Sequence, residues 1–247
     1  MDRLIYTSLT AMRGSMARQT AIANNLANAQ TPGFRADIAE AQSIWLKGGG
    51  LQARAMASEE VIAADMRSGT VAQTGRDLDV AVNGDALLVV QSEEGEEAYT
   101  RRGDLQLNDA GLLTTGDGRP VIGTQGPITL PPFDSVSIDK DGRISIVPRG
   151  ADPTKPQQVD QLRLVSPKGS NTVKGLDGLF RVRDGGTLPD DPDAELITKS
   201  LEGSNVSATE ALVAMIEASK GWDNQLKLLS DAREMDVATA DLMRLPQ

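Results

Sequence analysis

Hydrophobic residues recur with helical spacing along the first 26 residues of the chain. One row repeats every seven residues. A second row has the same repeat and is offset from the first by four residues. The two rows are Ile5, Met12, Gln19 and Leu26, and Leu9, Met16 and Ala23. This a/d spacing is typical of a coiled-coil seam with one polar position. Pro32 and Gly33 follow it and predict the end of the helix.

The C-terminal segment carries the same kind of pattern. Ser207 and Glu210 form a capping box, which predicts a helix from about Ser207 to Met243. Its main stripe alternates steps of three and four residues, and a second series lies on another face. They are Leu212, Met215, Ser219, Trp222, Leu226 and Leu229, and Leu228, Met235 and Leu242. A helix cannot bury its own stripe, so the simplest partner for each terminal helix is the other terminus.

Between these helices the pattern changes to short strands and turns. Residues 77–82 alternate before an Asn-Gly turn signal, which predicts a half-buried strand with Asp77 and Asp79 on its solvent side. Residues 135–147 favour a hairpin with a three-residue loop, because that register pairs Val136 with Ile146 and Ile138 with Ile144. Gly142 then takes the left-handed position.

The same argument predicts a three-residue loop at 109–111 that pairs Leu107 with Leu113. The sequence therefore predicts an α+β fold, in which long N- and C-terminal α-helices pair as a coiled-coil-like layer and flank a central all-β domain. The expected parts are an N-terminal helix with an Asn-rich motif (1–35), a linker or extended segment (36–69), the β domain (70–200) and a C-terminal helix (201–247). Whether the Ala-rich part of the linker is a short helix or extended chain stays open.

Composition narrows the classes of function. The chain of 247 residues has a formal charge of −10 and no basic run, which argues against binding to nucleic-acid phosphates. It has neither Cys nor His, so the usual metal ligands, the thiol nucleophile and the imidazole base are missing. We therefore expect no metal site and no cofactor. No apolar stretch has the length of a signal-peptide core or a membrane span, so we expect neither a Sec signal nor membrane insertion.

Carboxylates are the remaining candidates for catalysis. The candidates are Asp77, Asp79, Asp85, Asp139 and Asp141. Two aspartates on one strand face are able to act as acid and base or to bind Ca²⁺. A solvated strand face and ordinary turn chemistry explain them better, so no catalytic residue and no enzyme activity is predicted.

Three asparagines, Asn24, Asn25 and Asn28, lie near the end of the first helix, although Asn is a poor helix former. They fall outside the a/d seam. One interpretation makes Asn28 a helix-end residue and the other two a solvated face. The other has their amides hydrogen-bonding to a neighbouring copy of the chain. The pattern leaves both open.

The stretch that contains these asparagines, ANNLANAQTPGFR (23–35), resembles the N-terminal motif of the flagellar rod and hook proteins. TGRDLDVAVNGDALLVVQ, AYTRRGDLQLNDAGLLTTGDGRPVIG and GPITLP are similar to the β domain of that family, and LEGSNVSATEALVAMIEASKGWDNQLKLL is similar to its C-terminal motif. MDRLIYTSLTAM, DGLFRV and LEGSNV are most similar to the proximal rod class. A distal rod or hook subunit is the alternative.

The resemblance implies a structural subunit that polymerises through its terminal helices into the tubular drive shaft of the flagellar basal body. It implies that the chain leaves the cell through the flagellar type III export apparatus without a cleaved Sec signal and joins the periplasmic rod. The implied partners are other copies of the chain and neighbouring rod proteins.

The stripes and the resemblance together predict a set of subunit-interface residues. They are Ile5, Leu9, Met12, Met16, Asn24, Asn25, Leu26, Asn28, Phe34, Asn205, Leu212, Met215, Ile216, Trp222, Leu226 and Leu229. Phe34 has two interpretations, since Phe34 and Ile38 resemble an export-recognition pattern, whereas a Phe after a helix break also anchors the chain.

Overall fold

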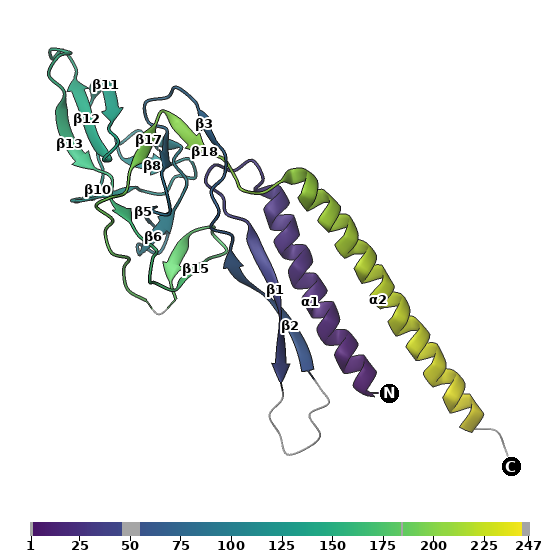
Figure 1. Cartoon of the computed structure of the whole chain (residues 1–247). Helices are drawn as coiled ribbons and strands as arrows, with labels where there is room; N and C mark the ends of the chain where they lie inside the picture. Colours follow the sequence, from purple (N-terminus) through teal and green to yellow (C-terminus); the bar gives the residue numbers. More distant parts are fainter. Residues whose placement is uncertain (1, 46–54, 184, 244–247) are drawn as a thin grey trace. The chain divides into compact units, whose positions relative to one another are not determined.

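The computed structural model describes residues 2–45, 55–183 and 185–243 (Figure 1). The chain divides into two compact units. The helical unit contains residues 1–27, 37–63 and 207–247, and the β unit contains residues 28–36 and 64–206. Each unit is therefore assembled from segments that lie far apart in the sequence.

The helical unit contains two helices and a two-stranded sheet. Helix α1 spans Asp2–Ala27 and helix α2 spans Ala208–Met243, and Figure 1 shows the two running side by side. Strands β1 (Asp37–Trp45) and β2 (Ala55–Ala64) pair with each other, so the described parts of the segment left open by the sequence are extended. The predicted cap is confirmed, because the Glu210 backbone N–H donates to Ser207 Oγ over 3.3 Å.

The predicted coiled-coil-like layer is wrong. The described residues contain only α1 and α2 as helices, and the contact between them follows only one of the two predicted rows of each helix. At their contact, Ser15 Oγ donates to Gln225 Oε1 over 3.2 Å and Gln19 Nε2 donates to the Ala218 carbonyl over 3.3 Å. A coiled-coil seam needs apolar side chains in both rows, and small and polar residues occupy one of the rows here. A large β-rich region does lie between the helices in the sequence.

The β unit consists of short antiparallel strands. Its strands are β3 (Val71–Gln73), β4 (Val80–Val82), β5 (Leu87–Gln91), β6 (Glu97–Thr100), β7 (Leu105–Leu107), β8 (Leu113–Thr115), β9 (Ile122–Gly123), β10 (Gly126–Pro127), β11 (Phe133–Ile138), β12 (Arg143–Pro148), β13 (Gln157–Gln161), β14 (Leu164–Val165), β15 (Thr172–Lys174), β16 (Phe180–Val182), β17 (Leu196–Thr198) and β18 (Ser200–Glu202). The largest sheet has the order β14-β5-β6-β16-β15. Strand β3 pairs with β18 and β4 with β17, which brings the two ends of this unit together.

Two apolar clusters form the core of the β unit. The larger one is built from aliphatic residues of β4, β5, β7, β8 and β12, and the smaller one surrounds Tyr99 and Phe180. Strand β5 contributes to both clusters, because Leu88 and Val90 face the larger one and Leu87 and Val89 face the smaller one. The core therefore uses both faces of β5, as expected for a strand with an uninterrupted apolar run.

The predicted hairpin registers are confirmed. Val136 pairs with Ile146 and Ile138 pairs with Ile144, and Gly142 has a φ of 78° in the loop between them. Leu107 likewise pairs with Leu113. In both hairpins the apolar register and the left-handed glycine agree, so local turn chemistry fixed these pairings.

The predicted solvent position of Asp79 is wrong. Asp79 is buried, and its Oδ2 accepts a hydrogen bond of 2.6 Å from Thr74 Oγ1. Both faces of β4 are covered, since Val80, Ala81 and Val82 are all buried. Asp77 is half exposed and pairs with Lys199 over 2.9 Å. Alternation marks a half-buried strand only when one face of the sheet meets water.

Burial gives Tyr99 a distinctive titration. The Tyr99 hydroxyl donates to Glu97 Oε1 over 2.9 Å and accepts from the Leu188 backbone N–H over 2.8 Å. Burial raises the pKa of Tyr99 to about 12. Because the folded state favours the neutral phenol, this group's stabilisation is complete below pH 10 and is lost as the pH rises toward 12. An absorbance titration that compares the wild type with Tyr99→Phe measures this group. A difference signal with a midpoint near pH 10 would contradict the burial argument.

Candidate functional site

The contact between α1 and α2 uses only half of each predicted stripe. On α1, the half-buried side chains form the rows Met12, Gln19 and Leu26, and Ser8, Ser15 and Ile22. On α2, the rows are Met215, Trp222 and Leu229, and Ala211, Ala218 and Gln225. One predicted row of each helix therefore lies in this contact, and the second contact row is displaced by one residue from the predicted one. Ile5 belongs to α1, but its side chain lies outside the described part of the structure.

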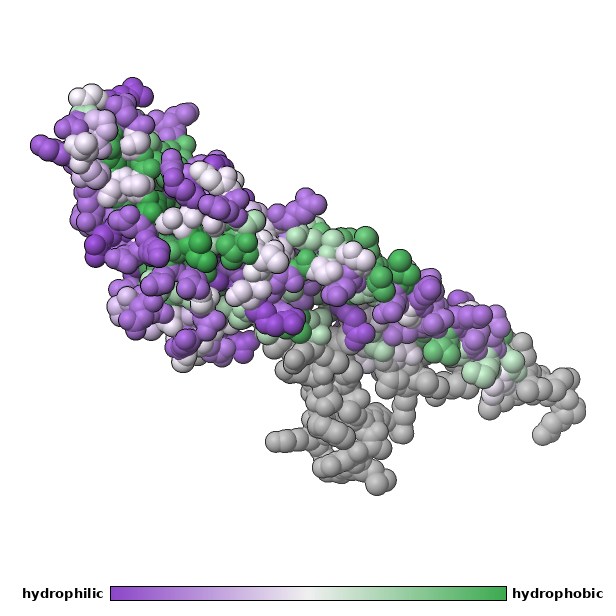
Figure 2. Space-filling model, turned by 45° about the horizontal axis from the view of Figure 1, so that its top comes forward, coloured by the Kyte–Doolittle hydropathy of each residue, from purple (hydrophilic) through white to green (hydrophobic). Residues whose placement is uncertain are grey.

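The displacement leaves large apolar side chains exposed. The exposed fractions are 44% for Leu9, 57% for Met16, 50% for Leu212, 56% for Ile216 and 45% for Leu226. We call these five residues the front face. Figure 2 shows hydrophobic side chains exposed at intervals along the helices, between polar ones. An exposed apolar row of this kind is a candidate interaction surface.

Helical geometry places the five residues on one side of the helix pair. Each residue advances by roughly 100° around an α-helix. The exposed row therefore lies about 90° on α1, and about 100° on α2, from the side that contacts the other helix. The helices are antiparallel, since Ser15 contacts Gln225 and Gln19 contacts Ala218. In an antiparallel pair, equal rotations in the same sense bring both rows to the same side.

The opposite side of α1 is tied to β1 through the asparagine motif. Asn25 Nδ2 donates to the Asp37 carbonyl over 2.9 Å, and the Asp37 backbone N–H donates to Asn25 Oδ1 over 2.7 Å. Asn24 Nδ2 also donates to Asp37 Oδ2. The donor and the acceptor of the Asn25 side chain therefore both bond to the backbone of Asp37, as a neighbouring strand would, and hold the start of β1. The assignment of Asn24 and Asn25 to a subunit interface stays a prediction.

Asn28 and Asn205 hold loops of the β unit. Asn28 Oδ1 accepts from Thr31 Oγ1 over 3.1 Å, in the turn that follows α1. Asn205 Nδ2 donates to the carbonyls of Asp65 and Arg67 over 2.8 and 2.9 Å, and its Oδ1 accepts from the Ala36 N–H over 2.7 Å. One Asn205 side chain thus joins three chain segments.

Phe34 is buried in the β unit. Lys174 Nζ lies 3.6 Å from the centroid of its ring, in a cation–π contact, and donates to the Arg35 carbonyl over 2.7 Å. The Phe34 carbonyl accepts from the Asn205 N–H over 3.3 Å. These contacts match the anchoring interpretation of Phe34, and a role in export stays a prediction.

Sequence reasoning missed a buried ion cluster next to Phe34. Glu202 Oε1 accepts from Arg35 Nη2 over 2.7 Å, and Glu202 Oε2 lies 2.7 Å from Arg101 Nη2 and 2.9 Å from Arg101 Nε. All three side chains are 1% exposed. Each comes from a different motif of the chain, so the cluster joins the segment after α1, strand β18 and the β domain. The sequence motifs that contain these residues were recognised, but Arg35 and Arg101 lie 167 and 101 positions from Glu202, so the pattern did not predict the ion pairs.

The cluster carries two cations and one anion. Arg101 completes its shell with carbonyls, donating to Gly84, Ala86 and Val82 over 2.7, 2.6 and 2.9 Å. Burial lowers the pKa of the Arg101 guanidinium, and the Glu202 carboxylate opposes that shift. Nε and Nη1 of Arg35 are buried without a hydrogen-bond partner among the described residues. Glu202 is therefore the centre on which both charges depend.

Gly33 has to be glycine for two reasons. Its φ is +67°, and a Cβ atom there would lie 2.4 Å from the carbonyl carbon and oxygen of Arg101. We expect Gly33→Ala to lower the free energy of unfolding by more than about 3 kcal/mol, because backbone atoms must move. Gly75→Ala is the matched control, since Gly75 has a φ of +79° and a Cβ atom there would meet no described atom within 4 Å. It should lower the free energy of unfolding by about 1 to 2 kcal/mol. Urea unfolding measures both, and equal losses would contradict the clash.

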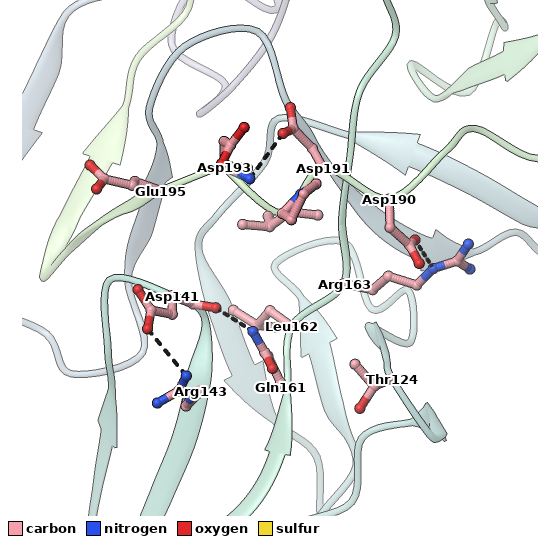
Figure 3. Close-up of a pocket in the computed structure, with 13 residues that line it drawn as sticks. Thr124, Asp141, Arg143, Gln161, Leu162, Arg163, Asp190, Asp191, Asp193 and Glu195 are labelled. Carbon is pink, nitrogen blue, oxygen red and sulfur yellow. Dashed lines mark hydrogen bonds and ion pairs between the residues drawn. The ribbon is translucent and has the colours of Figure 1, made fainter.

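A pocket of about 470 Å³ lies in the β unit beside the acidic segment 190–195 (Figure 3). Ion pairs occupy two of its sides. Arg163 Nε lies 2.6 Å from Asp190 Oδ1, and Arg143 Nη2 lies 3.5 Å from Asp141 Oδ2. No group of three metal-ligating side chains occurs among the described residues. The pocket therefore offers two carboxylates paired with arginines, and the Thr124 hydroxyl on its wall donates to Asp160 Oδ1 over 2.9 Å.

Neither α1 nor α2 has, over its described residues, the apolar stretch that a membrane span requires.

Three segments of the chain match models of known protein families. Three family models match: "Flagella basal body rod protein" over residues 5–35, "Flagellar hook protein FlgE/F/G D1 domain" over residues 81–146, and "Flagellar basal body rod FlgEFG protein C-terminal" over residues 197–242. The first and third cover most of α1 and α2. The second lies inside the β unit.

Curated relatives match over nearly the whole chain. The flagellar basal-body rod protein FlgF of Salmonella typhimurium is 37% identical, with 99% of this chain and 100% of the relative covered. FlgF of Escherichia coli is 38% identical, with 93% and 94% covered. The flagellar basal-body rod protein FlgG of Bacillus subtilis is 30% identical, with 99% and 100% covered. The chain therefore belongs to the flagellar basal-body rod protein family.

Proposed function

We propose that this chain is a structural subunit of the proximal rod and that it polymerises through its two terminal helices. The front face is the observation that carries this proposal. Five large apolar side chains lie on one side of a helix pair whose own contact does not use them. Burying the exposed half of such a side chain stabilises a contact by about 0.8 to 1.5 kcal/mol, so a neighbouring subunit gains several such terms at once.

The division into two units fits this role. The helical unit offers the surface for assembly, and the β unit has its own closed apolar core. The motif that links them, residues 28–36, is fixed within the β unit by Arg35 and by the backbone contacts of Gly33.

We propose that neighbouring rod proteins are further partners, because the relatives carry the names of two different rod proteins. We also propose passage through the flagellar type III export apparatus and a final location in the periplasmic part of the basal body. Catalysis has no part in this proposal.

Electron microscopy of basal bodies from a strain that lacks this protein tests the proposal. A rod that stops before its distal segment is the expected result, and restoring the wild-type gene should restore the full rod. A complete rod that lacks only its hook would assign the chain to the hook class. Intact flagella in the deletion strain would overturn the proposed function.

A further inference from the structure

Helix α2 has a second apolar row that the proposed function does not use. Val213, Leu228 and Met235 are 52%, 67% and 59% exposed. At roughly 100° per residue, this row lies about 130° around α2 from the front face and about 120° from the side that contacts α1. We call these three residues the rear stripe. The helix pair therefore has two different apolar surfaces on different sides.

Two different surfaces favour an open chain of copies. A contact between identical patches is isologous and closes as a dimer, whereas a contact between different patches repeats without limit unless its rotation closes a ring. A subunit that carried the front face alone would bury it best in a closed dimer. The rear stripe supplies a second, non-identical surface on the same unit.

The charges around the two surfaces are complementary. Residues 8–27 of α1 contain two arginines and no acidic residue, and the exposed Arg13 lies one helical turn from Leu9 and Met16. The rear stripe is flanked by the exposed acids Glu210, Glu217 and Asp231, and the bases near them are Lys220 and Lys227. The α1 half of the front face therefore carries positive charge, and the rear stripe carries an excess of negative charge.

We propose that the α1 half of the front face of one copy packs on the rear stripe of α2 of the next copy. The inference rests on the proposed function, since it specifies how the polymer is joined. Apolar side chains form the centre of this contact, and Arg13 and the acids of the rear stripe lie at its edge. The occupant of each surface is thus a second copy of this chain.

Crosslinking of assembled rods tests this contact, and the absence of cysteine makes every introduced thiol unique. Met16→Cys reports on the front face and Leu228→Cys on the rear stripe. The two variants are co-expressed in a strain that lacks the wild-type gene, and purified basal bodies are treated with a flexible bis-maleimide. We expect a crosslinked dimer only when both variants are present. Leu176→Cys, on a fully exposed side chain of the β unit, replaces Leu228→Cys as the negative control.

The possible results are distinct. Dimers from Met16→Cys alone would mean front-to-front contact and would overturn the proposal. A second pair of variants, Leu9→Cys and Met235→Cys, is tested in the same way. The proposal would also be overturned if basal bodies contained both variants of each pair but neither pair gave a mixed dimer. If the wild-type chain itself is absent from purified basal bodies, the proposed function fails before the contact is tested.

Discussion

Replacing Glu202 with alanine lowers the free energy of unfolding of the β unit by about 3 to 5 kcal/mol on this account. The change leaves Arg35 and Arg101 buried side by side, and among the described residues no other carboxylate forms an ion pair with Arg35. Gly69 also loses its contact, since its N–H donates to Glu202 Oε1 over 2.9 Å. Urea unfolding, followed by circular dichroism, measures the loss.

Three further variants separate this mechanism from a general sensitivity to mutation. Arg35→Met should cost less than Glu202→Ala, because it removes the excess cation and two buried donors that have no partner. Arg101→Met should lower the free energy of unfolding as much as Glu202→Ala. It removes the Arg101 donor from three carbonyls and leaves Glu202 paired with one cation. Glu93→Ala removes an exposed acid and should be neutral. A Glu202→Ala protein as stable as Glu93→Ala would show that the cluster does not hold the unit together.

The double variant Met16→Asp, Leu226→Asp should abolish incorporation into the rod without destabilising the monomer. Both side chains are about half exposed, so the isolated chain loses little when they change. In a subunit contact, each change removes about 0.8 to 1.5 kcal/mol of apolar burial, because about half of each side chain is still exposed, and adds a charge whose burial costs more. Together they should weaken the contact by about a hundredfold or more. Swimming motility and immunoblots of purified basal bodies measure assembly, and thermal unfolding measures the monomer.

Leu176→Asp is the matched control for this variant. It introduces one of the same carboxylates on a fully exposed side chain of the β unit, so assembly and motility should stay at the wild-type level. Normal motility of the double variant would remove the front face from the interface. Loss of motility with a fall in monomer stability would instead indicate that Met16 and Leu226 stabilise the folded chain.

The terminal helices show what a hydrophobic pattern specifies and what it leaves open. Leu9 and Met16 belong to the predicted stripe, for which the pattern gave the other terminus as the simplest partner, but both are exposed in the structure. Ser15 and Ala218 take that contact instead, because small side chains let two helices approach closely. A stripe identifies apolar positions, and it does not say whether the same chain or another one covers them.

In the β unit, local features were predictable and distant ones were not. The register at Gly142 followed from turn chemistry, which depends on a few neighbouring residues. The burial of Asp79 depends on the strands that cover it, and the contact of Arg35 with Glu202 spans 167 positions. An arginine after a helix break looks like a surface residue until the fold places a carboxylate beside it.

An electron cryomicroscopy map of the assembled rod, at a resolution that shows side chains, tests the central claim most directly. The account predicts that Leu9, Met16 and Leu212 are buried against a neighbouring subunit while each α1–α2 pair keeps the contacts Ser15–Gln225 and Gln19–Ala218. A rod in which these apolar side chains face solvent, and in which subunits touch only through their β units, would contradict it.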